Sequence, residues 1–117
     1  MRNSPLASVK KRGDFKRVFA CKKSAASSLF VVYACANDLE SSRLGLSVSK
    51  KVGGAVVRNR IKRLVREACR HIFGQARPGF DFIVIARAPA ASLPRSSAFA
   101  KTCDTLAQLF VRLQVLP

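Results

Sequence analysis

The chain has 117 residues, with 22 lysines and arginines against 6 aspartates and glutamates, and a formal net charge of +16. This length suits one domain with a modest core, and a hydrophobic content of 49% excludes a disordered basic tail. We therefore expect one folded domain over residues 1–117 that binds a polyanion. Its ends, residues 1–9 and 114–117, are expected to be loosely ordered.

An anionic membrane would attract the same charge, but the sequence does not favour one. No run approaches the roughly 20 apolar residues of a spanning helix. The beginning, MRNSPLASVKKRGDFKRVF, lacks the apolar core of a secretory signal. We expect a cytoplasmic protein with no membrane partner.

The first half of the sequence predicts a helix followed by two strands. Over residues 13–23, Phe15, Val18 and Phe19 recur at helical spacing among basic residues, and Asp14 is available as a cap. Residues 28–36, SLFVVYACA, are typical of a strand, and residues 43–49, RLGLSVS, alternate apolar with small or polar side chains. The polar segment between them predicts that the two strands pair as a hairpin.

The segment KKVGGAVVRNRIKRLVREACR, residues 50–70, predicts a basic amphipathic helix. Asn59, Arg63, Arg66 and Arg70 follow one another at spacings of four, three and four residues, so they share one face. The opposite side carries the apolar residues Ile61, Leu64, Val65, Ala68 and Ile72. A solvated basic face is the alternative interpretation.

The beginning of this helix favours an anionic ligand over that alternative. Arg58 and Arg60 occupy the first turns after Gly53 and Gly54, and Glu67 is the first acid of this segment. Cations at a helix N-terminus are unfavourable by about 0.3–1 kcal/mol each. The arrangement becomes favourable when phosphates bind the free N–H groups there.

The second half predicts one more strand and one more helix. A breaker segment at residues 74–79 precedes the strand-like run DFIVIAR at residues 81–87. Behind Pro94, an apolar stripe from Phe99 to Leu113 recurs at helical spacing. The predicted order is α-β-β-α-β-α, with room for one extra short strand, in a single α/β sandwich of the α+β class.

Neither the cysteines nor the acids form a recognisable chemical site. The four cysteines lie far apart without a C-x-x-C pair, so we expect buried, reduced thiols and no zinc site. The six acids are scattered singly, and the lone His71 belongs to no catalytic motif. We therefore predict no catalytic residue, no metal site and no cofactor bound by the polypeptide.

Aromatic residues beside basic ones suggest where a single-stranded RNA would bind. If the first helix crosses the sheet, Phe15, Phe19 and Tyr33 line a shallow cleft, and positive charge at its rim comes from Lys16, Lys50, Lys51 and Arg87. Unpaired bases stack on aromatic rings while cations contact the RNA backbone. The alternative is that the rings fill the core, and for Phe15 and Phe19 taken singly the sequence alone favours it.

The segment from Leu44 to Arg70 resembles the signature region of the protein subunit of bacterial ribonuclease P. The family's "RNR" motif matches Arg58-Asn59-Arg60, while DFKRVF at residues 14–19 and DFIVIAR resemble its first helix and last strand. The similarity extends from about residue 10 to residue 110. The sequence departs from the family pattern at residues 21–27, where a glycine-containing turn is more usual, and in the tail, residues 114–117.

The resemblance implies a helper of an RNA enzyme. Ribonuclease P removes the 5′ leader of precursor transfer RNA, and its large RNA subunit carries the catalytic centre and holds most of the Mg²⁺. The polypeptide would bind that RNA and the leader, with no obligate protein partner. The resemblance also implies a left-handed β-α-β crossover, against the usual right-handed rule.

The family's binding residues carry over to two groups of positions. Those matching the leader-binding cleft are Phe15, Phe19, Tyr33, Lys50, Lys51 and Arg87. Those matching the surface that faces the catalytic RNA are Arg58, Asn59, Arg60, Lys62, Arg63 and Arg66, with Arg70 on the same helix face.

Three alternatives fit parts of the pattern. A ribosomal or general RNA-binding protein without a processing role shares the size, charge and α/β build. A protein-only nuclease would need a metal site that the dispersed acids do not supply. A helix-turn-helix protein would need a second helix beside the basic one, where strand-like runs lie instead.

Overall fold

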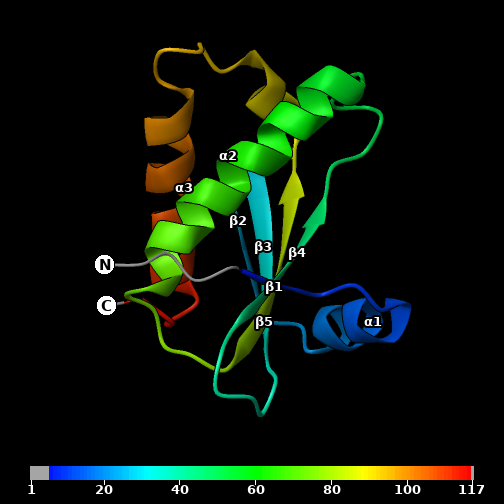
Figure 1. Ribbon diagram of the computed structural model, residues 1–117, viewed down its shortest axis with the longest axis vertical. Helices are drawn as coiled ribbons and strands as arrows, with labels where there is room; N and C mark the ends of the chain where they lie inside the picture. The colour runs from blue at the N-terminus through cyan, green and yellow to red at the C-terminus, as the bar shows by residue number, and fades with distance from the viewer. Residues whose placement is uncertain (1–5, 117) are drawn as a thin grey trace.

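The structure, a computed structural model, describes residues 6–116 (Figure 1). It centres on a five-stranded sheet in the order β1-β4-β5-β3-β2. The strands are β1 (Ala7–Ser8), β2 (Ser24–Ala26), β3 (Phe30–Ala36), β4 (Arg43–Ser47) and β5 (Phe80–Ala86). The helices are α1 (Arg12–Ala20), α2 (Ala55–Phe73) and α3 (Ala98–Arg112), with a short 3₁₀ helix, η1 (Ala88–Ser92). The predicted α+β class is confirmed, and two short strands, β1 and β2, are added to the predicted order.

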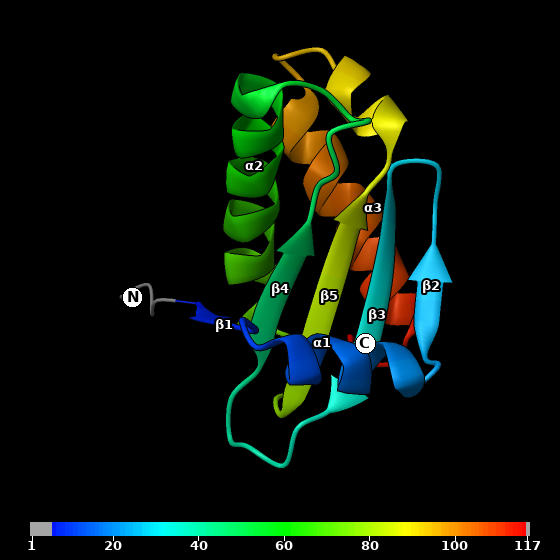
Figure 2. The ribbon, with the colours of Figure 1, turned by 90° about the vertical axis from the view of Figure 1, so that its right-hand side faces the viewer.

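The core lies between one face of the sheet and helices α2 and α3. Alternate side chains of β3 and β5, among them Phe30, Val32 and Phe82, point to this side and are fully buried. The apolar stripes of the two helices, represented by Val65 and Phe110, complete the same cluster. Helix α1 lies alone on the opposite face, which we call the front face (Figure 2).

The predicted hairpin between residues 28–36 and 43–49 is wrong, because β5 lies between β3 and β4. Leu44 of β4 pairs with Phe82 of β5 in parallel register, whereas Tyr33 of β3 pairs antiparallel with Ile83. The sequence FDFIVIA explains this position: Asp81 to Val84 are all buried, as expected of a strand that is covered on both faces.

The connection from β4 through α2 to β5 is left-handed. In Figure 2 both strands point upwards, β5 lies to the right of β4, and α2 lies on the far side of the sheet. Parallel strands joined by a helix cross over with the opposite hand in about 98% of cases. The crossover implied by the family resemblance is therefore present.

Residues near both chain ends, where the sequence led us to expect loose order, contact the rest of the fold. Ala7 and Ser8 pair with β4, and Val9 is buried. Near the other end, Val115 is fully buried, and its carbonyl accepts a hydrogen bond of 2.7 Å from the N–H of Arg77. These residues are thus buried or hydrogen-bonded although they lie close to the ends of the chain. Residues 1–5 and 117 lie outside the described part.

Helix α1 is shorter than predicted, and Asp14 is not its cap. The helix begins after Lys11, which makes no side-chain capping bond, and Asp14 lies within the first turn, where an acid interacts favourably with the helix dipole. Beyond its end, Lys22 has a φ of 60°, the left-handed conformation that glycine adopts most readily. Among residues 6–116, no helix is both long and apolar enough to cross a membrane.

Candidate nucleic-acid interface

Helix α1 lays its aromatic residues across the front face of the sheet. The rings of Phe19 and Tyr33 meet edge to face, with centroids 4.8 Å apart, and Phe15 lies 6.4 Å from Phe19. Phe19 is 38% exposed, and Phe15 and Tyr33 are half-buried. All three lie on the side of the sheet away from the buried core, so the structure does not favour core filling.

Phe15 reaches its position because Gly45 of β4 has no side chain. A Cβ built on Gly45 would lie 3.0 Å from Cζ of Phe15 and 3.2 Å from Cβ of Val9, closer than such contacts normally are. Glycine weakens a strand and often marks a place where another group approaches closely. Gly45 is not among the predicted site residues, although a glycine inside the strand pattern LGLSV was the signal.

Beyond the aromatic residues, the front face continues as a strip of small and apolar side chains. We call this row, formed by Ser47, Ile85, Val31 and Ala26 in register across β4, β5, β3 and β2, the front strip. Its members are exposed or half-buried. Helix α1 crosses the strands near the lower ends of β4 and β5 in Figure 2, where its Phe15 meets Gly45, two residues before Ser47.

Of the basic residues predicted for the cleft, Lys16 is exposed on α1, and the other three lie beyond the front strip. Lys50 and Lys51 are exposed in the segment after β4, and exposed Arg87 follows β5. Because β4 and β5 are parallel, both segments begin at the same end of the sheet, where the carboxyl ends of these two strands lie. The Arg87 guanidinium donates a hydrogen bond of 3.0 Å to the carbonyl of Ser27. The aromatic residues and these three cations of the predicted cleft thus lie on opposite sides of the strip.

The predicted RNA-facing residues of α2 divide into two groups. Lys62, Arg66 and Arg70, spaced four residues apart, line an open pocket of about 350 Å³ beside the edge of β4. Phe15, Val9 and Leu46 form apolar parts of the same lining, so this pocket joins the aromatic residues to the basic helix. Arg70 also pairs with Glu67.

The second group lies outside the pocket and, apart from Arg63, nearer the beginning of α2. Asn59 and Arg63 are exposed. Arg58 and Arg60 are half-buried and donate hydrogen bonds to backbone carbonyls, Arg58 to Gly53 at 3.1 Å and Arg60 to Ala91 at 3.5 Å.

The N-terminus of α2 begins at two glycines and has no acidic residue in its first turn. Gly54 is the N-cap, no side chain caps the helix, and no acid lies in its first turn. A Cβ on Gly53 would lie 2.9 Å from Cγ1 of Val57, so a larger residue does not fit there without movement. Free backbone N–H groups and nearby basic side chains make this helix end attractive to a phosphate.

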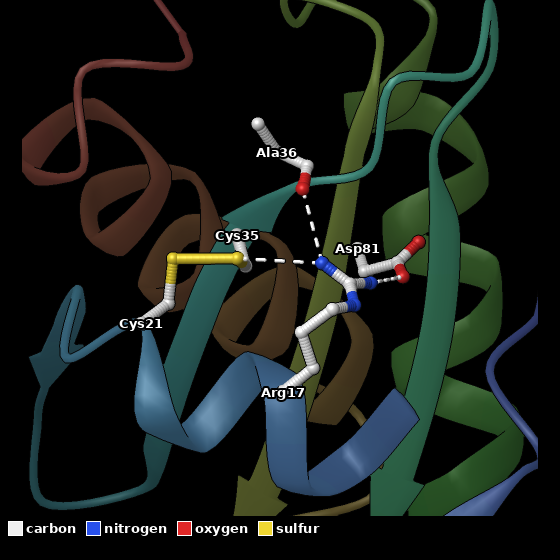
Figure 3. Close-up of a disulfide and its surroundings, with 5 residues drawn as sticks. All are labelled: Arg17, Cys21, Cys35, Ala36 and Asp81. Carbon is white, nitrogen blue, oxygen red and sulfur yellow. Dashed lines mark hydrogen bonds and ion pairs between the residues drawn. A yellow bond between two sulfur atoms is a disulfide. The ribbon is translucent and has the colours of Figure 1, made fainter. Parts of the chain in front are cut away.

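A buried carboxylate holds α1 to the sheet at the far end from the front strip. Asp81 has 0% exposure and accepts hydrogen bonds from Arg43 at 2.8 and 2.6 Å and from Asn37 at 2.9 Å. Arg17 of α1 forms a further ion pair with it (Figure 3). Burial alone would raise the pKa of Asp81, but the hydrogen bonds from Arg43 and Asn37 and the charges of Arg43 and Arg17 hold it below its usual value.

Sequence reasoning treated Asp81 as one scattered acid and did not assign Arg17 or Arg43 to it. An aspartate that begins an otherwise apolar strand was the available signal, because a buried carboxylate needs cationic partners. The three partners come from α1, β4 and the segment after β3. Asp81 therefore joins parts of the chain that are distant in sequence.

The prediction of reduced, buried cysteines holds in full only for Cys69, because Cys21 and Cys35 are oxidised and Cys103 is half-buried. Cys21 at the end of α1 and Cys35 of β3 form a disulfide, with their Cα atoms 5.8 Å apart (Figure 3). Cys21 is exposed and Cys35 is half-buried. The helix end brings Cys21 to the front face, which its distance from Cys35 in sequence did not reveal.

The other two cysteines are free, Cys69 buried and Cys103 half-buried. Burial raises the pKa of the Cys69 thiol far above its ordinary value. Within residues 6–116, no three histidines, cysteines or acids come close enough together to hold a metal ion.

Comparison with known proteins gives one consistent result. The sequence model of the family Ribonuclease P matches residues 4–114. The ribonuclease P protein component of Exiguobacterium sibiricum is 45% identical over 105 residues, which cover 89% of this chain and 87% of that protein.

Solved structures agree with the sequence comparison. The ribonuclease P protein of Staphylococcus aureus superimposes with a TM-score of 0.81 at 37% identity, covering 97% of this chain and all of that chain (100%). The protein from Thermotoga maritima gives a TM-score of 0.78 at 34% identity, covering 89% of this chain and 96% of that one.

Proposed function

Because this chain belongs to the ribonuclease P protein family and is thus the protein subunit of that endoribonuclease, we propose that it grips the leader of precursor transfer RNA on its front face. The observation that carries this proposal is the partly exposed Phe19–Tyr33 pair on the face of the sheet opposite the core. Base stacking on such rings contributes about 1–3 kcal/mol for each base.

The front strip gives the leader a continuous path. An extended strand that stacks on Phe15, Phe19 and Tyr33 can pass over the apolar row of Val31 and Ile85 towards the basic edge of the sheet. There Lys50, Lys51 and Arg87 neutralise its phosphates. Stacking and phosphate contacts carry little sequence information, so leaders of many sequences should bind.

Helix α2 supplies the proposed surface for the catalytic RNA. Asn59, Arg63 and Arg66 are exposed on it, and its uncapped N-terminus, with Arg58 and Arg60, favours phosphate. Lys62, Arg66 and Arg70 line the pocket that Phe15 also reaches. The two proposed RNA surfaces therefore meet at this pocket, where the protein can lower the repulsion between two polyanions.

We also propose that the polypeptide does no bond breaking. The carboxylate oxygens of Asp81 already accept hydrogen bonds from Arg43 and Asn37 and face Arg17, so they do not fit a divalent cation. The Mg²⁺ ions for leader removal would then be held mainly by the RNA subunit. We place the protein in the cytoplasm, as its sequence led us to expect.

Reconstitution with the catalytic RNA tests the leader proposal directly. Phe19→Ala should raise the Kd of leader-bearing precursor about tenfold, which corresponds to one lost stacking contact, and leave that of mature transfer RNA unchanged. Phe99→Ala is the matched control, because Phe99 is a phenylalanine of similar exposure, 41% against 38%, on α3. Equal losses for precursor and mature transfer RNA would show that Phe19 only packs.

A further inference from the structure

The disulfide lies directly beside the aromatic pair that we assign to the leader. Cys21 follows Phe19 by two residues, and Cys35 follows Tyr33 by two residues on the same face of β3. The covalent bond therefore joins the two segments that carry the contacting rings. It fixes the end of α1 against β3, close to where those rings meet.

Without this bond, the end of α1 has weaker support than its beginning. Lys22, the residue after Cys21, holds the left-handed φ of 60°, which is unfavourable for residues other than glycine by about 1–2 kcal/mol. Earlier in the helix, Phe15 packs on Gly45 and Arg17 pairs with buried Asp81. Opening the disulfide should therefore loosen Phe19 more than Phe15.

The two sulfur atoms differ in access and in electrostatic environment. Cys21 is exposed, so a small thiolate can reach its Sγ. Cys35 is half-buried, and Nη1 of Arg17 lies 3.4 Å from its Sγ (Figure 3). A neighbouring guanidinium stabilises a thiolate, which makes Cys35 the better leaving group.

We propose that Cys21–Cys35 is a thiol–disulfide exchange site for low-molecular-weight thiols, and that its oxidised form holds the aromatic pair ready for the leader. This inference rests on the proposed function. A thiolate attacks Sγ of Cys21, the S–S bond breaks, and its electron pair leaves on Sγ of Cys35. A second thiolate then releases the small-molecule disulfide from Cys21, so two thiols are oxidised and the protein disulfide is reduced to two thiols.

The site is chemically suited to respond to redox conditions. An exposed bond is open to exchange, and disulfides in the cytoplasm, where we place this protein, are mostly transient and redox-sensing. The free thiol of Cys69 is buried, with a raised pKa, and cannot substitute for the pair. Reduction should weaken leader binding without changing the surface of α2.

The test uses the reconstituted holoenzyme in oxidised and reduced thiol buffers, with precursor and mature transfer RNA as ligands. Mass spectrometry of the oxidised full chain should find Cys21 joined to Cys35. Reduction should raise the precursor Kd about three- to tenfold, if the ordered pair is then populated for only a third to a tenth of the time. The Kd of mature transfer RNA should stay the same.

Variants separate the pair from other thiols. The double variant Cys21→Ser with Cys35→Ser should bind precursor as the reduced wild type does, with the same Kd in both buffers. Cys103→Ser should respond to reduction like the wild type. Phe19→Ala should abolish most of the response, since the disulfide acts through that ring. A response that persists in the double serine variant would overturn the assignment.

The outcomes also separate this inference from the proposed function. A precursor preference that is equal in both buffers would overturn the exchange site and leave the leader function intact. A holoenzyme that binds precursor and mature transfer RNA alike in both buffers would refute the leader function itself. Failure of Cys21 and Cys35 to pair under oxidising conditions would overturn the inference without any binding measurement.

Discussion

Phe15 lies against Gly45, and a single added carbon on Gly45 would come within 3.0 Å of its ring. Gly45→Ala should therefore displace Phe15 and weaken precursor binding several-fold while α2 still binds the catalytic RNA. Filter binding measures both affinities, for precursor and for catalytic RNA, with mature transfer RNA as the reference ligand. An alanine that leaves precursor affinity unchanged would show that the glycine serves only the strand.

Gly13→Ala is the control for the preceding substitution. Gly13 lies inside α1, and a Cβ there meets nothing within 4 Å. Alanine should stabilise the helix by about 0.5–1 kcal/mol. Urea unfolding should show this gain, with unchanged precursor binding.

Asp81 should make the protein sensitive to acid. Its pKa is lowered in the folded state, so its stabilising effect is fully present above the unfolded value of about 3.9 and is lost as the pH falls through the folded value. The free energy of unfolding should thus decline below about pH 4. Urea titrations from pH 7 to pH 2 follow this decline, which Asp81→Asn should flatten.

Removal of the Asp81 carboxylate should also be costly at neutral pH. Asp81→Ala leaves Arg17 and Arg43 without their buried partner, and breaking such a pair costs about 3–5 kcal/mol when both members are buried. Here the two guanidinium groups keep some contact with solvent, with side-chain exposures of 39% and 25%. We expect about 3 kcal/mol, and a loss below 1 kcal/mol would mean that the network is dispensable.

The exposed cations of α2 should set the affinity for the catalytic RNA. Arg63→Ala with Arg66→Ala should weaken holoenzyme assembly and reduce the slope of log affinity against log salt by about two, one for each lost phosphate contact. Arg95→Ala with Lys101→Ala removes equal charge from exposed positions before and within α3. If both pairs of substitutions have the same effect, net charge alone determines assembly.

Anions that bind only the folded protein should stabilise it. A net charge of +16 opposes the compact state, and an anion present at 100 times its Kd adds about 2.7 kcal/mol to the free energy of unfolding. Thermal melts in sulfate and in chloride of equal ionic strength separate binding from screening. Equal melting temperatures in the two salts would argue against specific anion sites.

The sequence predicted those parts of the fold that depend on local pattern. The apolar stripe of α2 is present at Ile61, Val65, Ala68 and Ile72, although Leu64 is only half-buried, and the apolar run after Asp81 forms the buried strand β5. The pairing of β3 with β4 was mispredicted because a short polar connection favours a hairpin, whereas the greater burial available to β5 places it between them. The apolar run of β5 is consistent with a central strand, but its pairing partners depend on the whole sheet.

The candidate site was predictable in its residue types more than in its arrangement. The basic face of α2 follows from spacing alone. The pocket that Lys62 and Phe15 both line depends on where α1 and α2 pack beside β4 in the tertiary fold. The pairing of Cys21 with Cys35 likewise depends on the packing of α1 across the sheet. Contacts between elements distant in sequence require the tertiary fold.

The central position of β5 has a consequence for the newly synthesised chain. β5 begins only at Phe80 of the 117 residues, and until it is made β3 and β4 lack their common neighbour. During translation the first two thirds of the chain must therefore wait with unpaired strand edges, and folding should be governed by late, long-range contacts. Most of the polypeptide will therefore have been synthesised before the sheet can form.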